Sequence, residues 1–238
     1  MELLNETSAS GRKSTAILTS GGLDSAILLA QSLGRGEDVY PLYIRNGYFW
    51  EAAELAHLER WVGALRGSGL KPLQVLDLPV ADLLPHHWST SGREVPGADS
   101  PDEAVYLPAR NALLLAKAML WCHLKGVASV ALAVLKSNPF PDATPEFFEA
   151  FQDVMNRAFC GAVQIRRPFA DLEKTAVMHL GRGLPLEWTF SCIHPRRGRH
   201  CGACNKCAER RWAFAEAGMT DPTVYESDRL PGRGMGPG

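Results

Sequence analysis

The hexapeptide Ser20-Gly21-Gly22-Leu23-Asp24-Ser25 constrains the fold of this chain more than any other part of its sequence. It follows a short apolar run at 15–19, typical of a buried strand, and precedes a stretch at 25–33 with the pattern of a helix. Glycines at such a junction leave backbone amides free at the positive end of a helix, where phosphate binds. The turn lacks the Gly-Lys-Ser/Thr ending of a Walker loop. A plain tight connection is the alternative, but the complete hexapeptide at this junction favours a nucleotide site.

Alternating strand and helix patterns continue along the chain. We expect further strands at 39–44, 74–78, 127–135 and 163–166, and helices at 49–65, 109–124, 144–159, 173–180 and 205–217. Right-handed crossovers between such strands predict an α/β fold with a doubly wound, mostly parallel five-stranded sheet, covered by helices on both faces. The first strand is usually central in such a sheet, so the glycine turn should lie at the middle of its carboxyl edge.

Some of these helices carry predictions at single residues. Pro108 is expected in the first turn of the helix at 109–124, and Thr144 is expected to be the N-cap of the next helix. The segment 79–105 has four prolines and no clear periodicity, which favours a mobile active-site loop. The apolar positions of the helix at 49–65 are expected on one buried face: Ala52, Leu55, Ala56, Leu58 and Val62.

Four of the six cysteines crowd into sixteen residues near the C-terminus: Cys192, Cys201, Cys204 and Cys207. Cys-x-x-Cys spacing turns both sulfurs toward one ion, and four thiolates complete a tetrahedral Zn²⁺ site without an open position. A structural zinc ion is therefore predicted, with His194 and His200 as rival ligands and with a disulfide or an iron–sulfur cluster as alternatives. Cys122 and Cys160 lie in apolar stretches and are expected to be buried.

The net charge of −1 gives no general attraction to nucleic acid or to an anionic membrane. No apolar run is long enough to cross a bilayer, and residues 1–13 lack the hydrophobic stretch of a signal peptide. We therefore expect a cytoplasmic protein with no membrane partner and no strong nucleic-acid signal.

The glycine turn and the cysteine cluster together resemble the 7-cyano-7-deazaguanine synthase (QueC-like) family of N-type ATP pyrophosphatases, and the resemblance covers nearly the whole chain. Tyr106-Leu107-Pro108-Ala109-Arg110-Asn111 is similar to the Tyr-x-Pro-x-Arg-Asn segment of that family. Pro168-Phe169 with Lys174 resembles its Pro-Leu…Lys element. Trp188-Thr189-Phe190-Ser191-Cys192 and the segment 200–207 resemble its zinc region.

This resemblance implies a ligase that adenylates the carboxylate of 7-carboxy-7-deazaguanine with ATP, adds ammonia, and dehydrates the amide to a nitrile after a second activation. It implies ATP binding by Ser20–Ser25 with Mg²⁺, catalytic roles for Lys174, Arg110 and Asp24, and zinc binding by the four clustered cysteines. It also implies a homodimer. The expected parts are an extension at 1–13, an ATP-binding α/β domain at 14–187, a zinc-binding helical segment at 188–226 and a flexible tail at 227–238.

Two stretches depart from the family pattern. Residues 43–48 replace a Tyr-Gly-Gln-Arg/Lys-His segment, with Glu51 as the remaining acid, and Thr144 stands where the family has an arginine. Because a lost arginine removes a planar partner for a carboxylate, Arg45 or Lys136 is expected to supply that charge. The predicted substrate residues are Tyr106, Asn111, Arg45, Lys136 and Asp142. Three alternatives stay open: a paralogue acting on another carboxylate, a tRNA-modifying enzyme, and a nucleotide-binding subunit without chemistry.

Overall fold

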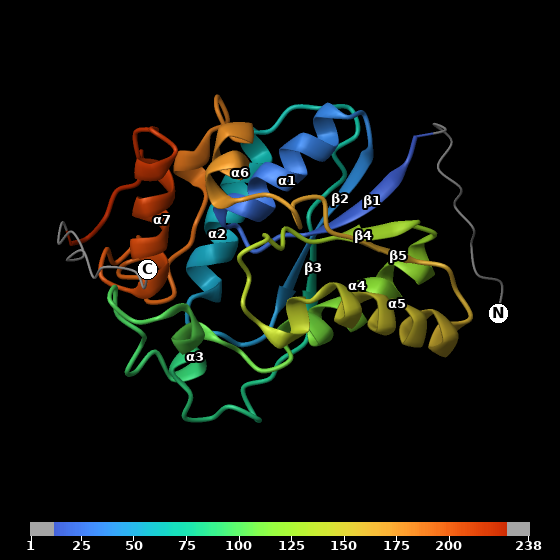
Figure 1. The fold of residues 1–238 in the computed structure, drawn as a ribbon, viewed down its shortest axis with the longest axis horizontal. Helices are drawn as coiled ribbons and strands as arrows, with labels where there is room; N and C mark the ends of the chain where they lie inside the picture. The colour runs from blue at the N-terminus through green and yellow to red at the C-terminus, as the bar shows by residue number, and fades with distance from the viewer. Residues whose placement is uncertain (1–11, 228–238) are drawn as a thin grey trace.

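The computed structural model describes residues 12–227 and contains one parallel sheet (Figure 1). The strands lie in the order β3-β2-β1-β4-β5, and each neighbouring pair is parallel. The order reverses at β1, so β1 is central, and the predicted fold class is confirmed. The bounds are β1 Ser14–Leu18, β2 Asp38–Arg45, β3 Gln74–Asp77, β4 Ser129–Ala131 and β5 Gln164–Arg166.

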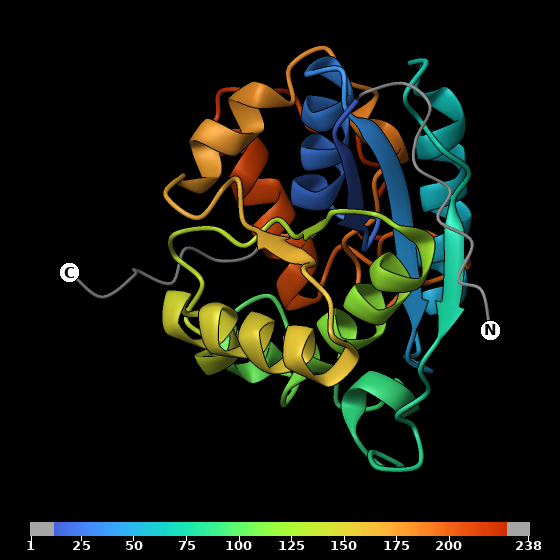
Figure 2. The same ribbon diagram turned by 90° about the vertical axis from the view of Figure 1, so that its right-hand side faces the viewer.

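Helices cover both faces of this sheet, as Figures 1 and 2 show. Helices α4 and α5 lie below the sheet in Figure 1, and α1 and α6 lie above it. Helices α2 and α7 contribute to the same hydrophobic core as α1 and α6. The bounds are α1 Leu23–Gly34, α2 Glu51–Ala64, α3 Trp88–Ser91, α4 Arg110–Lys125, α5 Pro145–Phe159, α6 Lys174–Leu180 and α7 Asn205–Glu216. Short 3₁₀ turns lie at Asp102–Val105, Pro141–Ala143 and Leu186–Trp188.

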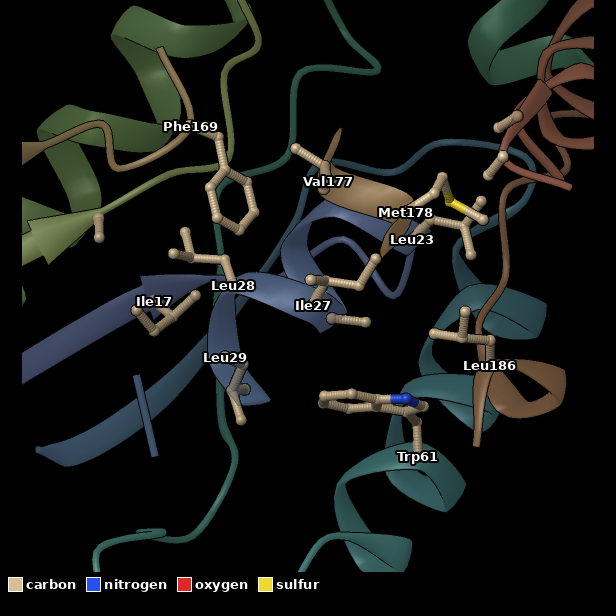
Figure 3. Packing of buried hydrophobic residues seen from close by; sticks show 14 of the residues in the cluster. Ile17, Leu23, Ile27, Leu28, Leu29, Trp61, Phe169, Val177, Met178 and Leu186 are labelled. Carbon is tan, nitrogen blue, oxygen red and sulfur yellow. The ribbon is translucent and has the colours of Figure 1, made fainter. Parts of the chain in front are cut away.

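Successive side chains of a strand point to opposite faces of the sheet, so the protein has one hydrophobic core on each face. Ile17 of β1 belongs to the core under α1, whereas its neighbour Ala16 belongs to the core under α4 and α5. In the first core, Ile27 and Leu28 of α1 lie between Phe169 and Trp61 (Figure 3). The burial of α1 from two sides fixes the helix whose N-terminus follows the glycine turn.

A third cluster joins the segment 79–105 to the cysteine segment. It contains the four clustered cysteines together with aromatic and aliphatic side chains from both segments. Asn205 is central to this contact: its backbone amide donates to Pro96 O (3.0 Å), and its Nδ2 donates to Ser100 O (2.8 Å). The segment predicted as a mobile loop therefore includes α3 and a 3₁₀ turn, and it packs against the start of α7.

Some boundaries predicted from the sequence are wrong. Strand β4 ends at Ala131 rather than at residue 135, because its neighbour β5 is only three residues long. Residues 132–135 instead border the cavity described below. Pro108 precedes α4, since Ala109 is its N-cap with φ at 56°. The N-cap at Thr144 is confirmed: its hydroxyl accepts a hydrogen bond from the amide of Phe147 (3.2 Å).

Two burial predictions also differ from the structure. The buried residues of α2 are Glu54, Leu58 and Trp61, whereas Ala52 and Ala56 of the predicted face are exposed. Cys122 is buried as expected, but Cys160 is exposed at the end of α5, where it adopts a left-handed backbone (φ 52°). The expected tail lies outside the described residues except for Ser227, and so does the extension except for residues 12–13. Between residues 12 and 227, no helix combines the length and the apolar character needed to span a membrane.

Candidate active site

A cavity of about 380 Å³ lies at the carboxyl ends of the central strands, next to the glycine turn. Its wall includes the last residue of β1, residues 42–44 of β2, the segment 132–135 after β4, and the N-terminal ends of α1 and α4. Because β1 and β4 are the strands at which the sheet order reverses, this is the crevice where open α/β sheets bind their ligands. The volume is in the range of sites for small molecules and nucleotides.

One end of the cavity is the glycine turn itself. Gly21 has φ at +73°, a left-handed conformation that favours glycine, and Gly22 is the N-cap of α1. The Ser25 hydroxyl donates to Gly22 O (3.3 Å) and accepts from the backbone amide of Ser20 (3.2 Å). These bonds hold the turn open above the free amides at the start of α1, which is the arrangement that binds phosphate.

The glycine turn is also bound by a segment that is distant in the sequence. The backbone amide of Phe190 donates to Gly21 O (2.7 Å), so the segment leading to the cysteines joins the turn directly. A side chain at position 21 would meet Glu54 of α2 at 3.4–3.5 Å. The cavity therefore brings together the glycine turn, α2 and the C-terminal segment.

Lys174 and Asp24 form a close ion pair beside the turn. The Lys174 ammonium lies 2.8 Å from both carboxylate oxygens of Asp24 and 3.7 Å from Glu209 of α7. Burial opposes the charge on Lys174, but the two carboxylates outweigh it and raise the pKa of the lysine. Lys206 forms a further ion pair with Glu209. Lys174 is thus held in its charged form beside the glycine turn, and Glu209 links it to Lys206.

Arg110 lies on the other side of the cavity, at the first position of α4. Its Nε is buried and has no hydrogen-bond partner, and no ion pair to its guanidinium is found within residues 12–227. Its neighbour Asn111 is fully engaged with Asp142, which accepts from the Asn111 amide (2.9 Å). An unpaired guanidinium in a cavity is a ready partner for a carboxylate or a phosphate.

A carboxyl group and aromatic rings form the wall between these two ends. The Tyr43 hydroxyl donates to Glu54 Oε2 (2.7 Å), and both residues border the cavity. Burial raises the pKa of Glu54 to about 8, although the Tyr43 hydrogen bond and the Arg110 charge oppose that rise. Next to them, the Trp50 ring stacks on Tyr48 (4.8 Å between ring centroids) and on Trp88 (5.7 Å).

The structure brings most of the predicted site residues to this cavity, but not all. The residues that border it are Ser20, Gly22, Leu23, Asp24, Ser25, Arg110, Asn111, Asp142 and Lys174. Three predicted substrate residues lie elsewhere: Arg45 pairs with Asp77 (2.6 Å), Lys136 pairs with Glu173 (3.1 Å), and Tyr106 packs on Phe140. The two ion pairs are exposed, so neither charge is turned to the cavity.

Several cavity residues were not singled out from the sequence. Glu54, Trp50, Trp88 and Lys206 are the main ones. For Glu54 a signal was present, because Glu54, Leu58 and Trp61 follow the spacing of one helix face. A glutamate on a buried face with large apolar neighbours is rare without a functional or pairing partner.

The four clustered cysteines form a compact and buried ligand set. Their Sγ atoms all lie within 4.8 Å of one another, and two of the separations are 3.8 and 3.9 Å. A disulfide requires about 2.05 Å, whereas tetrahedral zinc with bonds of about 2.3 Å requires sulfurs about 3.8 Å apart. Backbone amides of His194 and Cys201 donate to Cys192 Sγ (3.3 Å each), which favours a thiolate. The cluster can therefore hold a metal ion.

His194 and His200 do not belong to this ligand set. The Nε2 of His200 accepts a hydrogen bond from the Ser191 amide (3.1 Å), and the His200 ring packs on Phe190 at 4.6 Å between ring centroids. The groups that could share one metal ion, within the described part of the chain, are the four sulfurs alone.

Comparison with known proteins gives consistent results. A family model described as "Queuosine biosynthesis protein QueC" matches residues 14–218. A 7-cyano-7-deazaguanine synthase of Dechloromonas aromatica (strain RCB) is 32% identical over 227 residues, covering 90% of this chain and 99% of that protein. One of Anaeromyxobacter sp. (strain Fw109-5) is 35% identical over 231 residues, covering 90% and 96%. A solved 4-thiouridine synthetase–RNA complex with bound ATP has a similar fold, with a TM-score of 0.50 at 14% identity over 86% of this chain and 50% of that one.

Proposed function

The chain belongs to the QueC family of queuosine biosynthesis proteins, and on that premise we propose that it converts 7-carboxy-7-deazaguanine into 7-cyano-7-deazaguanine with ATP and ammonia. Relatives named 7-cyano-7-deazaguanine synthase match about nine tenths of the chain, and the family model spans both the glycine turn and the cysteine cluster. The chemistry needs one cavity that holds both a triphosphate and a carboxylate.

One observation supports this proposal more than any other: the cavity has a phosphate turn at one end and an unpaired guanidinium in its wall. The turn and Lys174 bind the phosphates of ATP. Arg110 binds the carboxylate of the acid and directs one of its oxygens toward the α-phosphorus. Holding two reactants in this way removes much of the entropic part of the barrier.

The first chemical step follows from these positions. The carboxylate oxygen attacks the α-phosphorus, and the bond to the leaving pyrophosphate breaks. Negative charge moves onto the pyrophosphate oxygens, where the helix N-terminus and Lys174 stabilise it. Ammonia then replaces AMP to give the amide. A second adenylation on the amide oxygen releases another pyrophosphate; the carbon–oxygen bond then breaks, AMP leaves with that oxygen, and the nitrogen gives up its two protons to water.

The cysteine cluster fits Zn²⁺, and Cys192, Cys201, Cys204 and Cys207 are the residues that would hold it. Four thiolates leave no open position, so the ion would stabilise the fold and take no part in the reaction. Cys204 is the N-cap of α7 and Cys207 lies in its first turn. The ion would thereby fix the helix that carries Lys206 and Glu209.

Asp24 is the residue that we propose to hold Mg²⁺ bound with ATP, since carboxylate oxygens are ligands that this ion prefers. Such an ion would neutralise charge on the phosphates. Among the predicted substrate residues, Asn111 and Asp142 would orient Arg110, because their hydrogen bonds fix the start of α4. Tyr106, Arg45 and Lys136 would act at most from outside the cavity. A homodimer in the cytoplasm is the assembly that we propose from the family resemblance.

The test is a coupled measurement of pyrophosphate release and product mass. Purified protein is incubated with ATP, Mg²⁺, ammonium chloride and 7-carboxy-7-deazaguanine. We expect release of pyrophosphate that depends on the acid, and a product with the mass of the nitrile. Release with another aromatic acid alone would indicate a paralogue, RNA-dependent release would indicate tRNA modification, and no release with any acceptor would contradict the proposal.

A further inference from the structure

Glu54 offers one free carboxylate oxygen to the cavity. Its Oε2 accepts the hydrogen bond from Tyr43, and no hydrogen bond to Oε1 is found among residues 12–227. The side chain is buried, and Glu54 borders the cavity. Oε1 is not fully covered by protein, so it is open to the cavity and can accept a hydrogen bond from a ligand there.

Aromatic side chains from the residues just before Glu54 form part of the cavity wall. Trp50 lies one helical turn before Glu54, and Tyr48 lies two residues before Trp50. Both side chains are buried, and both border the cavity. The Trp50 ring stacks on Tyr48 and Trp88, so these rings form an apolar wall, and the Glu54 carboxylate supplies the negative charge that attracts a small cation. Walls of this kind fit a small cation with N–H donors, of which ammonium is the simplest.

Glu54 is also close to the place of reaction. A Cβ built at Gly21 would lie 3.5 Å from Glu54 Cγ, so the Glu54 side chain lies next to the glycine turn. Arg110 borders the same cavity and makes no ion pair with Glu54 within 4 Å in the described structure. The carboxyl group is therefore placed beside the position where an acyl adenylate would be held between the turn and Arg110.

We propose that Glu54, oriented by Tyr43, binds ammonium in this cavity and removes its proton, so that ammonia is formed next to the activated acid. The proposal rests on the proposed function, since it assigns the nitrogen donor of that reaction to a site. Glu54 is the catalytic base, and Tyr43 is a positioning residue that keeps the carboxyl group turned to the cavity.

Ammonium loses a proton to Glu54 before its nitrogen attacks the acyl carbon. One N–H bond of ammonium breaks, its electron pair stays on nitrogen, and the proton goes to Glu54 Oε1. The nitrogen pair then forms a C–N bond to the acyl carbon, and the carbon–oxygen bond to AMP breaks with its electrons on the AMP phosphate. The surplus proton on the new amide nitrogen leaves to water, and Glu54 returns its own proton to water before the next cycle.

The titratable groups around Glu54 are consistent with proton transfer between ammonium and this carboxyl group. Tyr43 of β2, Tyr48, Glu51 of α2 and Arg110 of α4 are the titratable groups that act on it. Glu51 is occupied by the backbone amides of Asn46 and Gly47, so it is not a competing base. Burial raises the pKa of Glu54 to about 8, close to the pH at which a base must exchange protons with ammonium.

The decisive variant is Glu54→Gln, compared with Glu59→Gln, an exposed glutamate on the same helix. Adenylation is followed alone by acid-dependent exchange of labelled pyrophosphate into ATP, without ammonium. Amide and nitrile formation is followed with ammonium present. We expect exchange within about threefold of the wild-type rate, and product formation reduced by about 100-fold or more, the usual effect of removing a general base. Loss of exchange together with product formation would overturn the proposal.

Hydroxylamine provides a second readout, because it is uncharged at neutral pH and needs no deprotonation before it attacks. Glu54→Gln should form the hydroxamate from hydroxylamine at close to the wild-type rate. The same variant should form almost no amide from ammonium. An equal loss with both nucleophiles would mean that Glu54 holds the acid or the fold, and it would contradict the base role. Glu54→Asp should keep a pH-dependent activity with ammonium.

A titration of the free protein separates this inference from the proposed function. The carboxyl carbon of Glu54 is observed by ¹³C NMR in glutamate-labelled wild type, with Glu54→Gln for assignment. Ammonium chloride should lower the midpoint of its titration, whereas tetramethylammonium chloride should not, because a bound N–H cation favours the carboxylate. An unchanged midpoint would overturn the ammonium site even if the enzyme makes the nitrile. A wild type that fails to use the deazapurine acid would contradict the proposed function alone.

Discussion

The Lys174 ammonium lies 2.8 Å from each carboxylate oxygen of Asp24, and this pair joins α6 to the first turn of α1. The two residues are 150 positions apart in the chain. The pair keeps a charged lysine beside the phosphate turn before any nucleotide arrives. A phosphate group that binds here competes with Asp24 for the Lys174 ammonium, unless Mg²⁺ binds the Asp24 carboxylate.

Lys174→Met should therefore reduce the rate of adenylation far more than the stability of the protein. Removing one cationic donor from developing phosphoryl charge typically lowers kcat by about 100- to 1,000-fold. Lys125→Met, at the far end of α4, is a matched control and should leave the rate unchanged. Acid-dependent pyrophosphate release at saturating ATP measures the effect. A change in KM for ATP with an unchanged kcat would contradict this role.

Gly21→Ala should weaken ATP binding. The left-handed backbone at position 21 disfavours alanine by roughly 1–2 kcal/mol, whereas the new methyl group would meet Glu54 only at van der Waals distance. Gly36→Ala is the matched control, because Gly36 has a similar φ of 76° and no heavy atom near its would-be Cβ. Both variants should lose similar stability in thermal unfolding. Only Gly21→Ala should raise the Kd for ATP, and equal affinities in the two variants would contradict the phosphate-turn assignment.

Arg110→Met should raise the KM for the acid. Hydrogen bonds to a charged group contribute about 1.5–3 kcal/mol, so we expect an increase of about 10- to 100-fold at saturating ATP. The comparison is Arg45→Met, which removes an exposed partner of Asp77 outside the cavity. Initial rates over a range of acid concentration measure both. If Arg45→Met has the larger effect, the acid binds elsewhere than proposed.

Cys201→Ser should lose the metal ion and much of the stability of the C-terminal segment. Three sulfurs cannot complete the tetrahedral site, and metal-binding energy contributes directly to folding. A loss of about 3 kcal/mol corresponds to a Tm lower by roughly 6–12 °C for a chain of this size. Elemental analysis and thermal unfolding are the measurements. Cys160→Ser, which changes an exposed cysteine, should keep both the metal content and the Tm.

Arg210→Leu tests a buried cation that packs the cysteine segment on the sheet. Its guanidinium donates to Thr223 Oγ1 (2.6 Å), Thr189 Oγ1 (2.8 Å) and Leu186 O (2.9 Å), and the side chain is almost completely buried. Leaving such acceptors unpaired should lower the free energy of unfolding by about 3–5 kcal/mol. Denaturant unfolding measures this loss. Arg60→Leu, on the exposed side of α2, should change it by less than about 0.5 kcal/mol.

The sequence predicted the fold well because it depends on local signals, and the same signals placed the glycine turn at the junction of β1 and α1. Apolar runs of strand length, glycines at a junction and helical spacing are read within about fifteen residues. Strand β4 was predicted too long for the same reason. Its apolar run continues to residue 135, but a strand extends only as far as its neighbour pairs with it, and β5 ends at Arg166.

The residues expected to bind the carboxylate substrate were predicted less well, because their positions depend on contacts between distant segments. Arg45 and Lys136 were expected to replace a missing charge, yet each forms an exposed ion pair with a residue of another segment. Glu54 becomes a cavity residue only when β2 places Tyr43 beside it and the turn packs against α2. Trp88 reaches the cavity because its segment folds back onto Trp50. Helical spacing indicates only that Glu54 lies on the buried face of α2, and contacts between distant segments do not follow from it.

The hydrogen bond from the Phe190 amide to Gly21 O has a consequence for how the protein is made. A ribosome synthesises the phosphate turn early and the segment that closes over it late. During that interval the turn lacks Phe190, Lys174 and the lysine of α7, so an unfinished chain has no complete site for ATP. The cavity is thus completed only after Asn205–Glu216 has been translated, long after the glycine turn.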